Sequence, residues 1–216
     1  MDSKQAEALL STQRNFFRTG TTLPVAFRLE ALDRLYRTIE ARQSEICDAL
    51  RHDLGKSETE SYMCEIGLVL SEITYMRRHL RKFSGARTVP TPLAQFASHS
   101  FVQPMPYGNV LIMSPWNYPF LLSVEPLVDA IAAGNTAIVK PSAYAPATAQ
   151  SVRSLVESCF APEFVTVVTG GRQENAVLLA LKFDLIFFTG SQAVGKVVLR
   201  QAAEQGHSEF RGQRNG

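Results

Sequence analysis

The residues with the clearest chemical potential follow short apolar runs. The turn Ser114-Pro-Trp-Asn-Tyr-Pro119 contains two prolines, which fix a rigid bend around the only tryptophan of the chain. This bend places Asn117 where its side-chain amide could donate to a developing oxyanion, or where it could simply cap a helix. Lys140 ends another apolar run, and Pro141 after it forces the chain out of the strand. The Lys140 side chain is thus either a hydrogen-bond donor to a ribose or phosphate, or an exposed lysine at a strand end.

Glycine-containing turns mark two further candidate sites. The segment Gly190-Ser-Gln-Ala-Val-Gly195 follows an apolar run and opens an amphipathic stretch. Free main-chain N–H groups and the helix dipole would make it an anion site of phosphate size, unless it is a plain tight turn. With Lys196 the segment nearly matches a Walker A loop, but Val197 stands where that loop needs Ser or Thr to hold magnesium. Gly170-Gly171 permits close approach of a nucleotide to the backbone, although a turn alone also favours glycine.

An alternation of strands and helices positions these candidates. Continuous apolar runs predict buried strands at 109–113, 136–140, 164–168 and 184–188, and helical periodicity predicts helices at 124–133, 146–159, 173–182 and 192–205. Continuous rather than alternating apolar strands indicate that both sheet faces are covered. Strands joined by crossover helices run parallel, so we predict an α/β fold with an open parallel sheet and helices on both faces. Such a sheet binds ligands outside the carboxyl ends of its strands, where all of the candidates lie.

Two other segments precede this sheet. Apolar residues at helical spacing predict helices over 5–18, from Pro24 to a C-cap at Gly55, and from Ser57 to Phe83. Each of these helices has an apolar face that needs a partner. Prolines and short extended stretches over 87–104 then predict a hairpin that projects from the main body. The exposed edge of such a hairpin commonly pairs with a second subunit.

Composition excludes several classes of function. A formal net charge of +2 is too small to indicate nucleic acid, so we expect a small molecule or another protein as the partner. Cys47, Cys64 and Cys159 lie in apolar helical patterns without metal-ligand spacing, and the histidines form no cluster; we expect buried thiols and no metal site. No apolar run approaches the ~20 residues that cross a bilayer, and the first residues contain no apolar leader-like run. We therefore expect a cytoplasmic protein without a membrane segment.

Five motifs, in this order, resemble those of the aldehyde dehydrogenase superfamily. They are Ser114-Pro-Trp-Asn-Tyr-Pro119, Ala132-Ala-Gly-Asn135, Val139-Lys-Pro-Ser142, Gly170-Gly171 and Phe188-Thr-Gly-Ser-Gln-Ala-Val-Gly195. Three further segments resemble its class 3, or fatty-aldehyde, branch: Ser57-Glu-Thr-Glu-Ser-Tyr62, Cys64-Glu-Ile-Gly67 and Thr91-Pro-Leu-Ala-Gln-Phe96. The resemblance runs from about residue 5 to about residue 204.

The resemblance implies a Rossmann-like domain that binds NAD or NADP, and oxidation of an aldehyde to a carboxylic acid through a covalent thiohemiacetal. It implies that Asn117 helps form the oxyanion hole, that Lys140 holds the adenosine ribose, and that Trp116 and Ser191 lie along the pyrophosphate. The remaining matches to cofactor-binding positions are Ser114, Ser142, Gly171, Gly190 and Gly195.

The resemblance also divides the chain. It assigns 1–86 to N-terminal helices that pack on the cofactor domain, 87–104 to an arm that would join a homodimer, 105–205 to an incomplete dinucleotide-binding domain, and 206–216 to a divergent tail.

Two departures from the family pattern affect the expected function. Ala143 stands where the family usually carries a glutamate that accepts ribose hydroxyls. Loss of that carboxylate removes repulsion toward a 2′-phosphate, so we predict comparable affinities for NADP and NAD. After Gln205 the family continues into a strand ending in Glu-Leu-Gly-Gly-Lys, which carries the general base, and later supplies the nucleophilic cysteine; this sequence contains neither. Phe210 is the only large apolar residue of the tail, so we expect no buried strand there.

Three interpretations remain open. In the first, the chain is an N-terminal portion of an aldehyde dehydrogenase, inactive alone because neither Cys64 nor Cys159 lies at a strand end. In the second, it is a non-catalytic dinucleotide-binding or interaction fragment, a decoy subunit that joins a full-length partner through the hairpin. In the third, it is an unrelated P-loop nucleotide hydrolase. Magnesium-dependent ATP binding would favour the third interpretation, and NAD binding without turnover would favour the first two.

Overall fold

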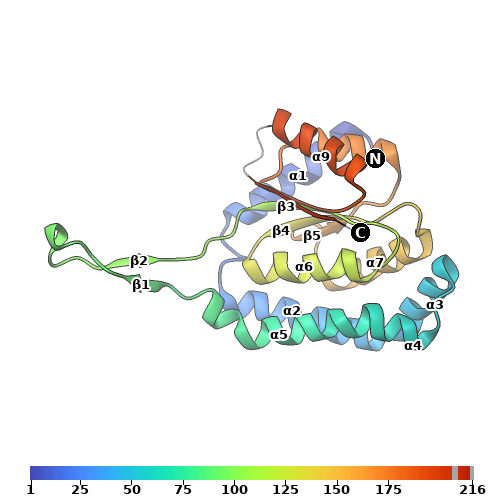
Figure 1. Cartoon of the computed structure of the whole chain (residues 1–216), viewed down its shortest axis with the longest axis horizontal. Coiled ribbons are helices and arrows are strands. Elements are labelled where there is room, and N and C mark those ends of the chain that lie inside the picture. Colours follow the sequence, from blue (N-terminus) through green and yellow to red (C-terminus); the bar gives the residue numbers. More distant parts are fainter. Residues whose placement is uncertain (206–208, 215–216) are drawn as a thin grey trace.

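A parallel β-sheet lies at the centre of the protein in this computed structural model, which describes residues 1–205 and 209–214. Within these residues the sheet has five strands in the order β5-β4-β3-β6-β7 (Figure 1). They are β3 (Asn109–Met113), β4 (Thr136–Lys140), β5 (Val165–Val167), β6 (Leu185–Gly190) and β7 (Glu209–Arg214). Met113 at the end of β3 pairs with Lys140 on one side and with Phe188 on the other. The carboxyl ends of three strands therefore meet at one edge of the sheet.

Helices connect these strands close to the predicted positions. They are α6 (Leu121–Ala133) after β3, α7 (Pro146–Cys159) after β4, α8 (Arg172–Leu179) after β5 and α9 (Gln192–Glu204) after β6. Pro146 occupies the first turn of α7, where its missing N–H costs nothing. α6 ends at Gly134, whose φ of +90° suits glycine. The predicted class, an open parallel sheet with helices on both faces, is confirmed.

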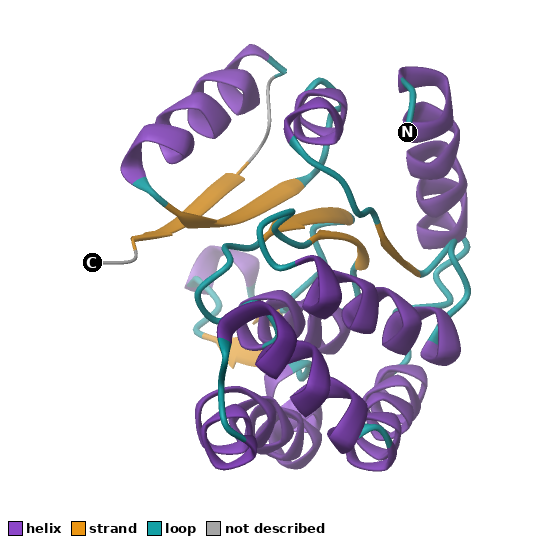
Figure 2. Cartoon of the chain, turned by 90° about the vertical axis from the view of Figure 1, so that its right-hand side faces the viewer, coloured by secondary structure: helices purple, strands orange, loops and turns teal. Residues whose placement is uncertain are grey.

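The sheet separates two hydrophobic clusters, which is why its strands are apolar on both sides. Val110 and Ile112 of β3 contact the cluster shared with α6 and α7. Leu111 and Met113, one residue along in each case, contact the opposite cluster with α1 (Ser3–Arg18), α8 and α9. Figure 2 shows these two helical layers on either side of the sheet. Successive side chains of a strand point to opposite faces, so every position of β3 is buried.

The other N-terminal helices form a further layer that packs on α6 and α7 (Figure 1). They are α2 (Val25–Ala41), α3 (Gln43–Leu54), α4 (Glu58–Ser61), a π-helical turn (Tyr62–Ile66) and α5 (Gly67–Phe83). The prediction of one uninterrupted helix from Pro24 to Gly55 is wrong. Arg42, with φ −110° and ψ 17°, separates α2 from α3, and its guanidinium is held by Glu45 and by Ser154 of α7. None of the helices in the described residues combines the length and the apolar character needed to span a bilayer.

The predicted hairpin is confirmed as an arm that extends away from the body (Figure 1). Its antiparallel strands are β1 (Arg87–Val89) and β2 (Ser100–Val102), with a short 3-10 turn (Leu93–Gln95) between them.

The C-terminal part of the sheet differs from the prediction in two respects. β6 continues to Gly190, so Thr189 and Gly190 belong to the strand rather than to the turn after it. Within the tail, residues 209–214 form the strand β7, which pairs in parallel with β6 although Phe210 is the only large apolar residue there. An edge strand is held by main-chain hydrogen bonds to a single neighbour, so it needs no apolar sequence of its own.

Candidate functional site

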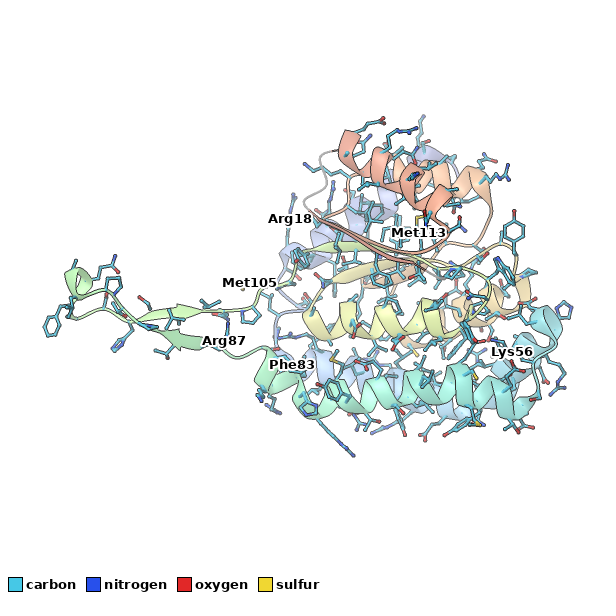
Figure 3. The ribbon with its side chains drawn as sticks, viewed as in Figure 1. Arg18, Lys56, Phe83, Arg87, Met105 and Met113 are labelled. Carbon is cyan, nitrogen blue, oxygen red and sulfur yellow. The ribbon has the colours of Figure 1, made fainter. Side chains whose placement is uncertain are left out.

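A cleft of about 460 Å³ opens at the carboxyl ends of β3, β4 and β6. The predicted site residues that line it are Ser114, Trp116, Lys140, Ser142, Gly171, Gly190 and Ser191. Trp116, Lys140 and Ser191 come from three separate strand ends, and their predicted convergence on one groove is confirmed. Asn117 and Gly195 are not among the lining residues. Figure 3 marks Met113, at this end of β3, within the body of the molecule and away from Arg87 in the arm. The binding roles of these residues stay predictions.

Lys140 is buried, so its interpretation as an exposed lysine at a strand end is wrong. Only 3% of the residue is accessible, and its Nζ donates to the main-chain oxygens of Pro141 (2.8 Å) and Gly170 (2.7 Å). Burial lowers the pKa of the Lys140 ammonium to about 8, and the nearby Glu174 carboxylate partly opposes this shift. Two carbonyl acceptors account for two of its three N–H donors. Lys140 therefore fixes the end of β4 to the Gly170-Gly171 turn at the cleft.

Carboxylates occupy the N-termini of three of the four helices that follow β3–β6. The Glu65 carboxylate accepts from Phe120 N–H (2.8 Å) at the start of α6. Asp53 does the same for α7, accepting from the N–H of Thr148 (2.7 Å) and of Ala147 (3.1 Å). Burial alone would raise the pKa of Asp53, but these hydrogen bonds lower it below its usual value. At α8, Glu174 accepts from Gly171 N–H (2.8 Å). These helix dipoles are therefore already matched by negative charge.

The fourth helix, α9, has no acidic residue in its first turn. Its N-cap, Ser191, accepts only a long hydrogen bond from Val194 N–H (3.4 Å). Gly190 and Ser191 line the cleft directly in front of this helix. The N-terminus of α9 is thus the helix end at this cleft where a bound anion would meet main-chain donors and no competing carboxylate.

The glycines at 190 and 195 pack against one aromatic ring. A Cβ at Gly190 would lie 2.7 Å from Cζ of Phe188, and a Cβ at Gly195 would lie 3.4 Å from Cε1 of the same ring. Phe188 is itself buried. Gly190 is therefore required by packing behind the cleft, independently of any ligand.

Asn117 does not cap a helix, so that interpretation is wrong. α6 begins at Leu121 with Phe120 at the N-cap position, and Glu65 satisfies its first N–H groups. The main-chain oxygen of Asn117 accepts instead from Lys56 Nζ (3.1 Å). Beside it, Trp116 is 54% exposed and lines the cleft. The turn thus presents an indole to the cleft and holds Asn117 next to it.

Several residues of the site were not found from the sequence. Arg172 and Asn175 line the cleft, and Arg172 is its second cation beside Lys140. Among the described residues that line the cleft, none is Asp or Glu. Arg172 directly follows the Gly170-Gly171 turn, so a basic residue at a helix start was a signal that could have been read. Lys56 and Glu65 carried no such local signal.

The thiols lie away from the cleft. Cys47 and Cys159 are buried, as predicted, whereas Cys64 is partly accessible in the π-helical turn. Burial raises the pKa of the Cys47 thiol, and the Glu58 and Asp48 carboxylates add to this shift. No cysteine is among the described residues that line the cleft. Within the described part of the chain, His, Cys, Asp and Glu side chains form no group of three that could hold a metal ion.

Known sequences resemble this chain along most of its length. The profile of the Aldehyde dehydrogenase family matches residues 1–210. A 4,4′-diaponeurosporen-aldehyde dehydrogenase of Staphylococcus aureus is 44% identical over 189 residues, which cover 88% of this chain and 41% of that protein. Aldehyde dehydrogenase family 3 member A2 of Mus musculus is 42% identical over 191 residues, covering 88% of this chain and 40% of its own. The predicted resemblance to the class 3 branch is thereby confirmed. The chain spans about two-fifths of the length of these relatives.

Solved structures share the fold. The substrate-bound AldH of Staphylococcus aureus superposes with a TM-score of 0.94 at 40% identity, over 97% of this chain and 46% of that one. A betaine aldehyde dehydrogenase of the same species, in complex with NAD⁺, has a TM-score of 0.88 at 24% identity, over 99% and 44%. GapN of Methanocaldococcus jannaschii, a glyceraldehyde-3-phosphate dehydrogenase complexed with NADP, has a TM-score of 0.86 at 20% identity, over 100% and 47%.

Proposed function

Because the chain belongs to the aldehyde dehydrogenase family, we propose that its cleft binds NAD or NADP as the cofactor part of a site that oxidises an aldehyde to a carboxylic acid. The observation that carries this proposal is the convergence of Trp116, Lys140 and Ser191 on one cleft at the strand ends. That position is where open parallel sheets bind nucleotides. The NAD⁺ and NADP complexes of the structural neighbours support the same class of cofactor.

The residues present fit a dinucleotide. The pyrophosphate would lie at the N-terminus of α9, the helix end at the cleft without a carboxylate, with Ser191 beside it. Lys140 would donate to the adenosine ribose, and the exposed face of Trp116 would pack along the dinucleotide. A bound dinucleotide would supply the hydride acceptor for this oxidation. The part of this chain is to bind and orient the cofactor, and the amide of Asn117 would donate to the carbonyl oxygen of the aldehyde.

None of the described residues that line the cleft is a cysteine, so the thiol that attacks the aldehyde would have to come from elsewhere in the protein. Cys47 and Cys159 are buried, and Cys64 lies in the helical layer outside the sheet. Attack requires a sulfur within about 3–3.5 Å of the carbonyl carbon. We therefore propose that aldehyde oxidation belongs to the whole protein and that these 216 residues alone bind nucleotide without turnover.

The charge of the cleft supports acceptance of NADP as well as NAD. Ala143 lines the cleft where the family usually has a glutamate, and Arg172 lines it as well. A 2′-phosphate would therefore meet two cations, Arg172 and Lys140, and no lining carboxylate.

Titration of the chain with nucleotides tests this function, with Trp116 as the intrinsic fluorescent probe because it is the only tryptophan. We expect NAD and NADP to change its emission with comparable dissociation constants and without magnesium. ATP binding that requires magnesium would favour the P-loop interpretation instead, and NAD binding far tighter than NADP binding would refute the dual specificity. A chain that binds none of the three nucleotides would overturn the proposed function.

The arm favours a second role, assembly with another subunit. Leu93 and Phe96 at its tip are 92% and 91% exposed, and Phe101 in β2 is 62% exposed. Such apolar exposure on a two-stranded arm is typical of a surface that another chain covers. We propose that the arm forms a homodimer or joins a full-length homologue. Light scattering of the chain, alone and mixed with a complete class 3 homologue, should show a complex that Phe96→Ser weakens; a monomer in both samples would contradict this role.

A further inference from the structure

We infer that Lys56 and Glu65 are positioning residues that hold the 114–119 turn at the cleft. Both belong to the N-terminal helical layer and are buried, with 7% and 0% of their surfaces exposed. Neither lines the cleft, so any effect on a ligand must pass through the turn. The inference rests on the proposed function in one respect: the position of the turn affects ligands because Trp116 and Asn117 are proposed to contact the cofactor and the aldehyde.

Lys56 contacts the turn through both its charge and its hydrogen bonds. Its Nζ donates to Glu65 Oε1 (2.6 Å) and to the main-chain oxygen of Asn117 (3.1 Å), and it lies 4.2 Å from the centre of the Tyr118 ring. Figure 3 shows Lys56 at the end of the molecule opposite the arm. The Asn117 oxygen belongs to a planar peptide group, so this hydrogen bond orients the whole 117–118 peptide. A residue distant in the sequence thereby sets how the backbone of Asn117 is presented.

Glu65 ties the same cation to the helix that follows the turn. Its Oε1 accepts from Lys56, while its Oε2 accepts from the N–H of Phe120 (2.8 Å) and of Leu121 (3.1 Å). One buried carboxylate thus joins Lys56 to the start of α6, and both of its oxygens are satisfied. The turn between β3 and α6 is therefore anchored at its C-terminal end by Glu65 and along its backbone by Lys56.

Glu65 lies in a π-helical turn rather than in a regular α-helix, and this turn places its carboxylate next to Lys56 and the start of α6. Gly67 N–H donates to Tyr62 O, five residues earlier, which defines the π-helical turn Tyr62–Ile66. A Cβ at Gly67 would lie 2.9 Å from that oxygen, closer than side chains approach. The π-turn inserts one residue into the helical repeat, and Gly67 is the residue type that allows it. Single-turn π-bulges occur frequently at functional sites.

The pair specifies geometry more than it adds stability. A buried ion pair must offset the desolvation of both charges, and apolar replacements are often as stable. Its hydrogen bonds, however, are directional, and here they end on main-chain groups of the turn and of α6. Loss of Lys56 should consequently loosen the turn even where the chain stays folded.

The experiment uses the 216-residue chain and its single tryptophan, Trp116. Lys56→Met keeps an unbranched side chain and removes the ammonium group. Acrylamide quenching of Trp116 without nucleotide measures how accessible the turn is to the quencher. Titrations with NAD and AMP measure their dissociation constants at the cleft. We expect K56M to raise the quenching constant about twofold or more and to weaken NAD binding about tenfold. AMP, which would contact the Lys140 end, should change by less than about threefold.

Arg28→Gln is the matched control. Arg28 is a buried cation that donates to Ala132 O (2.9 Å), at the other end of α6 and away from the turn. Its loss should lower thermal stability without changing Trp116 quenching. Equal effects of K56M and R28Q on quenching at equal loss of stability, or no effect of K56M, would overturn the inference.

Two further points keep the result unambiguous. If K56M does not fold, the double variant K56M/E65Q removes the unpaired buried carboxylate and must still raise the quenching constant; wild-type quenching would then overturn the inference. Quenching is measured without nucleotide, so a chain that binds neither NAD nor NADP would refute the proposed function while the positioning role is still decided by Trp116.

Discussion

Nζ of Lys140 lies 2.7 Å from the main-chain oxygen of Gly170, so one buried cation joins the end of β4 to the glycine turn after β5. The same burial lowers the pKa of the Lys140 ammonium to about 8, with Glu174 opposing the shift. The ammonium charge of Lys140 can therefore be removed within an accessible pH range.

Nucleotide affinity should decrease as the pH rises through 8. Only the protonated form of Lys140 attracts a phosphate, so above its pKa the dissociation constant of NADP should rise by up to about tenfold per pH unit. Fluorescence titration of Trp116 between pH 6 and 10 measures this dependence. Lys140→Met should bind weakly and should lose the dependence; a variant that retains the wild-type pH profile would contradict the assignment.

Stability should change in the opposite direction over the same interval. The pKa of Lys140 in the folded chain is below that of an unfolded lysine, ~10.4, so the unfolded state binds more protons between these values. The contribution of Lys140 to the free energy of unfolding therefore rises with pH from about 8 to 10, by roughly 3 kcal/mol in total. Urea unfolding of wild type and K140M at several pH values isolates this contribution. A loss of affinity caused by unfolding would instead coincide with a loss of stability.

A carboxylate at position 143 should restore discrimination against NADP. Ala143→Glu places a negative charge in a cleft that Arg172 and Lys140 make positive, and it would repel the 2′-phosphate that NAD lacks. We expect NADP to bind at least about tenfold more weakly, with a change of less than about threefold for NAD. Arg172→Gln should shift the ratio in the same direction. Equal effects of either substitution on both nucleotides would place the 2′-phosphate elsewhere.

Two glycines that line the cleft should respond differently to alanine. A Cβ at Gly190 would lie 2.7 Å from the buried Phe188 ring, whereas a Cβ at Gly171 has no heavy atom within 4 Å. Gly190→Ala should lower the free energy of unfolding by about 1–3 kcal/mol, and Gly171→Ala should change it by less than about 0.5 kcal/mol. Urea unfolding measures both. Phe188→Leu combined with G190A should recover part of the loss, since it shortens the side chain that the new methyl meets.

Local sequence patterns were sufficient to place several residues of the cleft, but not Arg172 or Asn175. The apolar runs that end at Met113 and Lys140 are strands because they are buried on both faces, and parallel pairing alone then brings their ends together. Trp116 and Ser191 follow from the same logic, because Trp116 lies in the turn after β3 and Ser191 comes directly after β6. These positions needed no knowledge of distant contacts.

Contacts between distant segments could not be predicted in this way. Glu65 caps α6 across 55 positions of sequence, and the π-turn that carries it leaves no mark on the apolar periodicity of the stretch. The sequence around Arg42 keeps a helical pattern, yet the helix is interrupted there. The Arg42 side chain donates to Ser154 of α7, a contact that the local sequence does not reveal. The strand β7 was missed because main-chain pairing to β6 does not depend on an apolar sequence.

Asp53 offers a separate test of how the helical layer supports the sheet. Its carboxylate accepts hydrogen bonds from Thr148 and Ala147 at the start of α7, and these lower its pKa against the effect of burial. Asp53→Asn should lower the free energy of unfolding at pH 7 by about 1–2 kcal/mol, because it removes a charge that complements the helix dipole.

Acidification should remove this difference. A carboxyl group with a lowered folded pKa stabilises the protein fully above the unfolded value, ~3.9, and this contribution is lost as the pH falls through the folded pKa. Wild type and D53N should therefore converge in urea unfolding measured at successively lower pH. Asp48→Asn is the control on the same helix, α3, because Asp48 pairs with Arg51 at the exposed surface and its loss should cost less than about 0.5 kcal/mol. A D53N deficit that persists at low pH, or an equal deficit in D48N, would show that the charge of Asp53 does not stabilise α7.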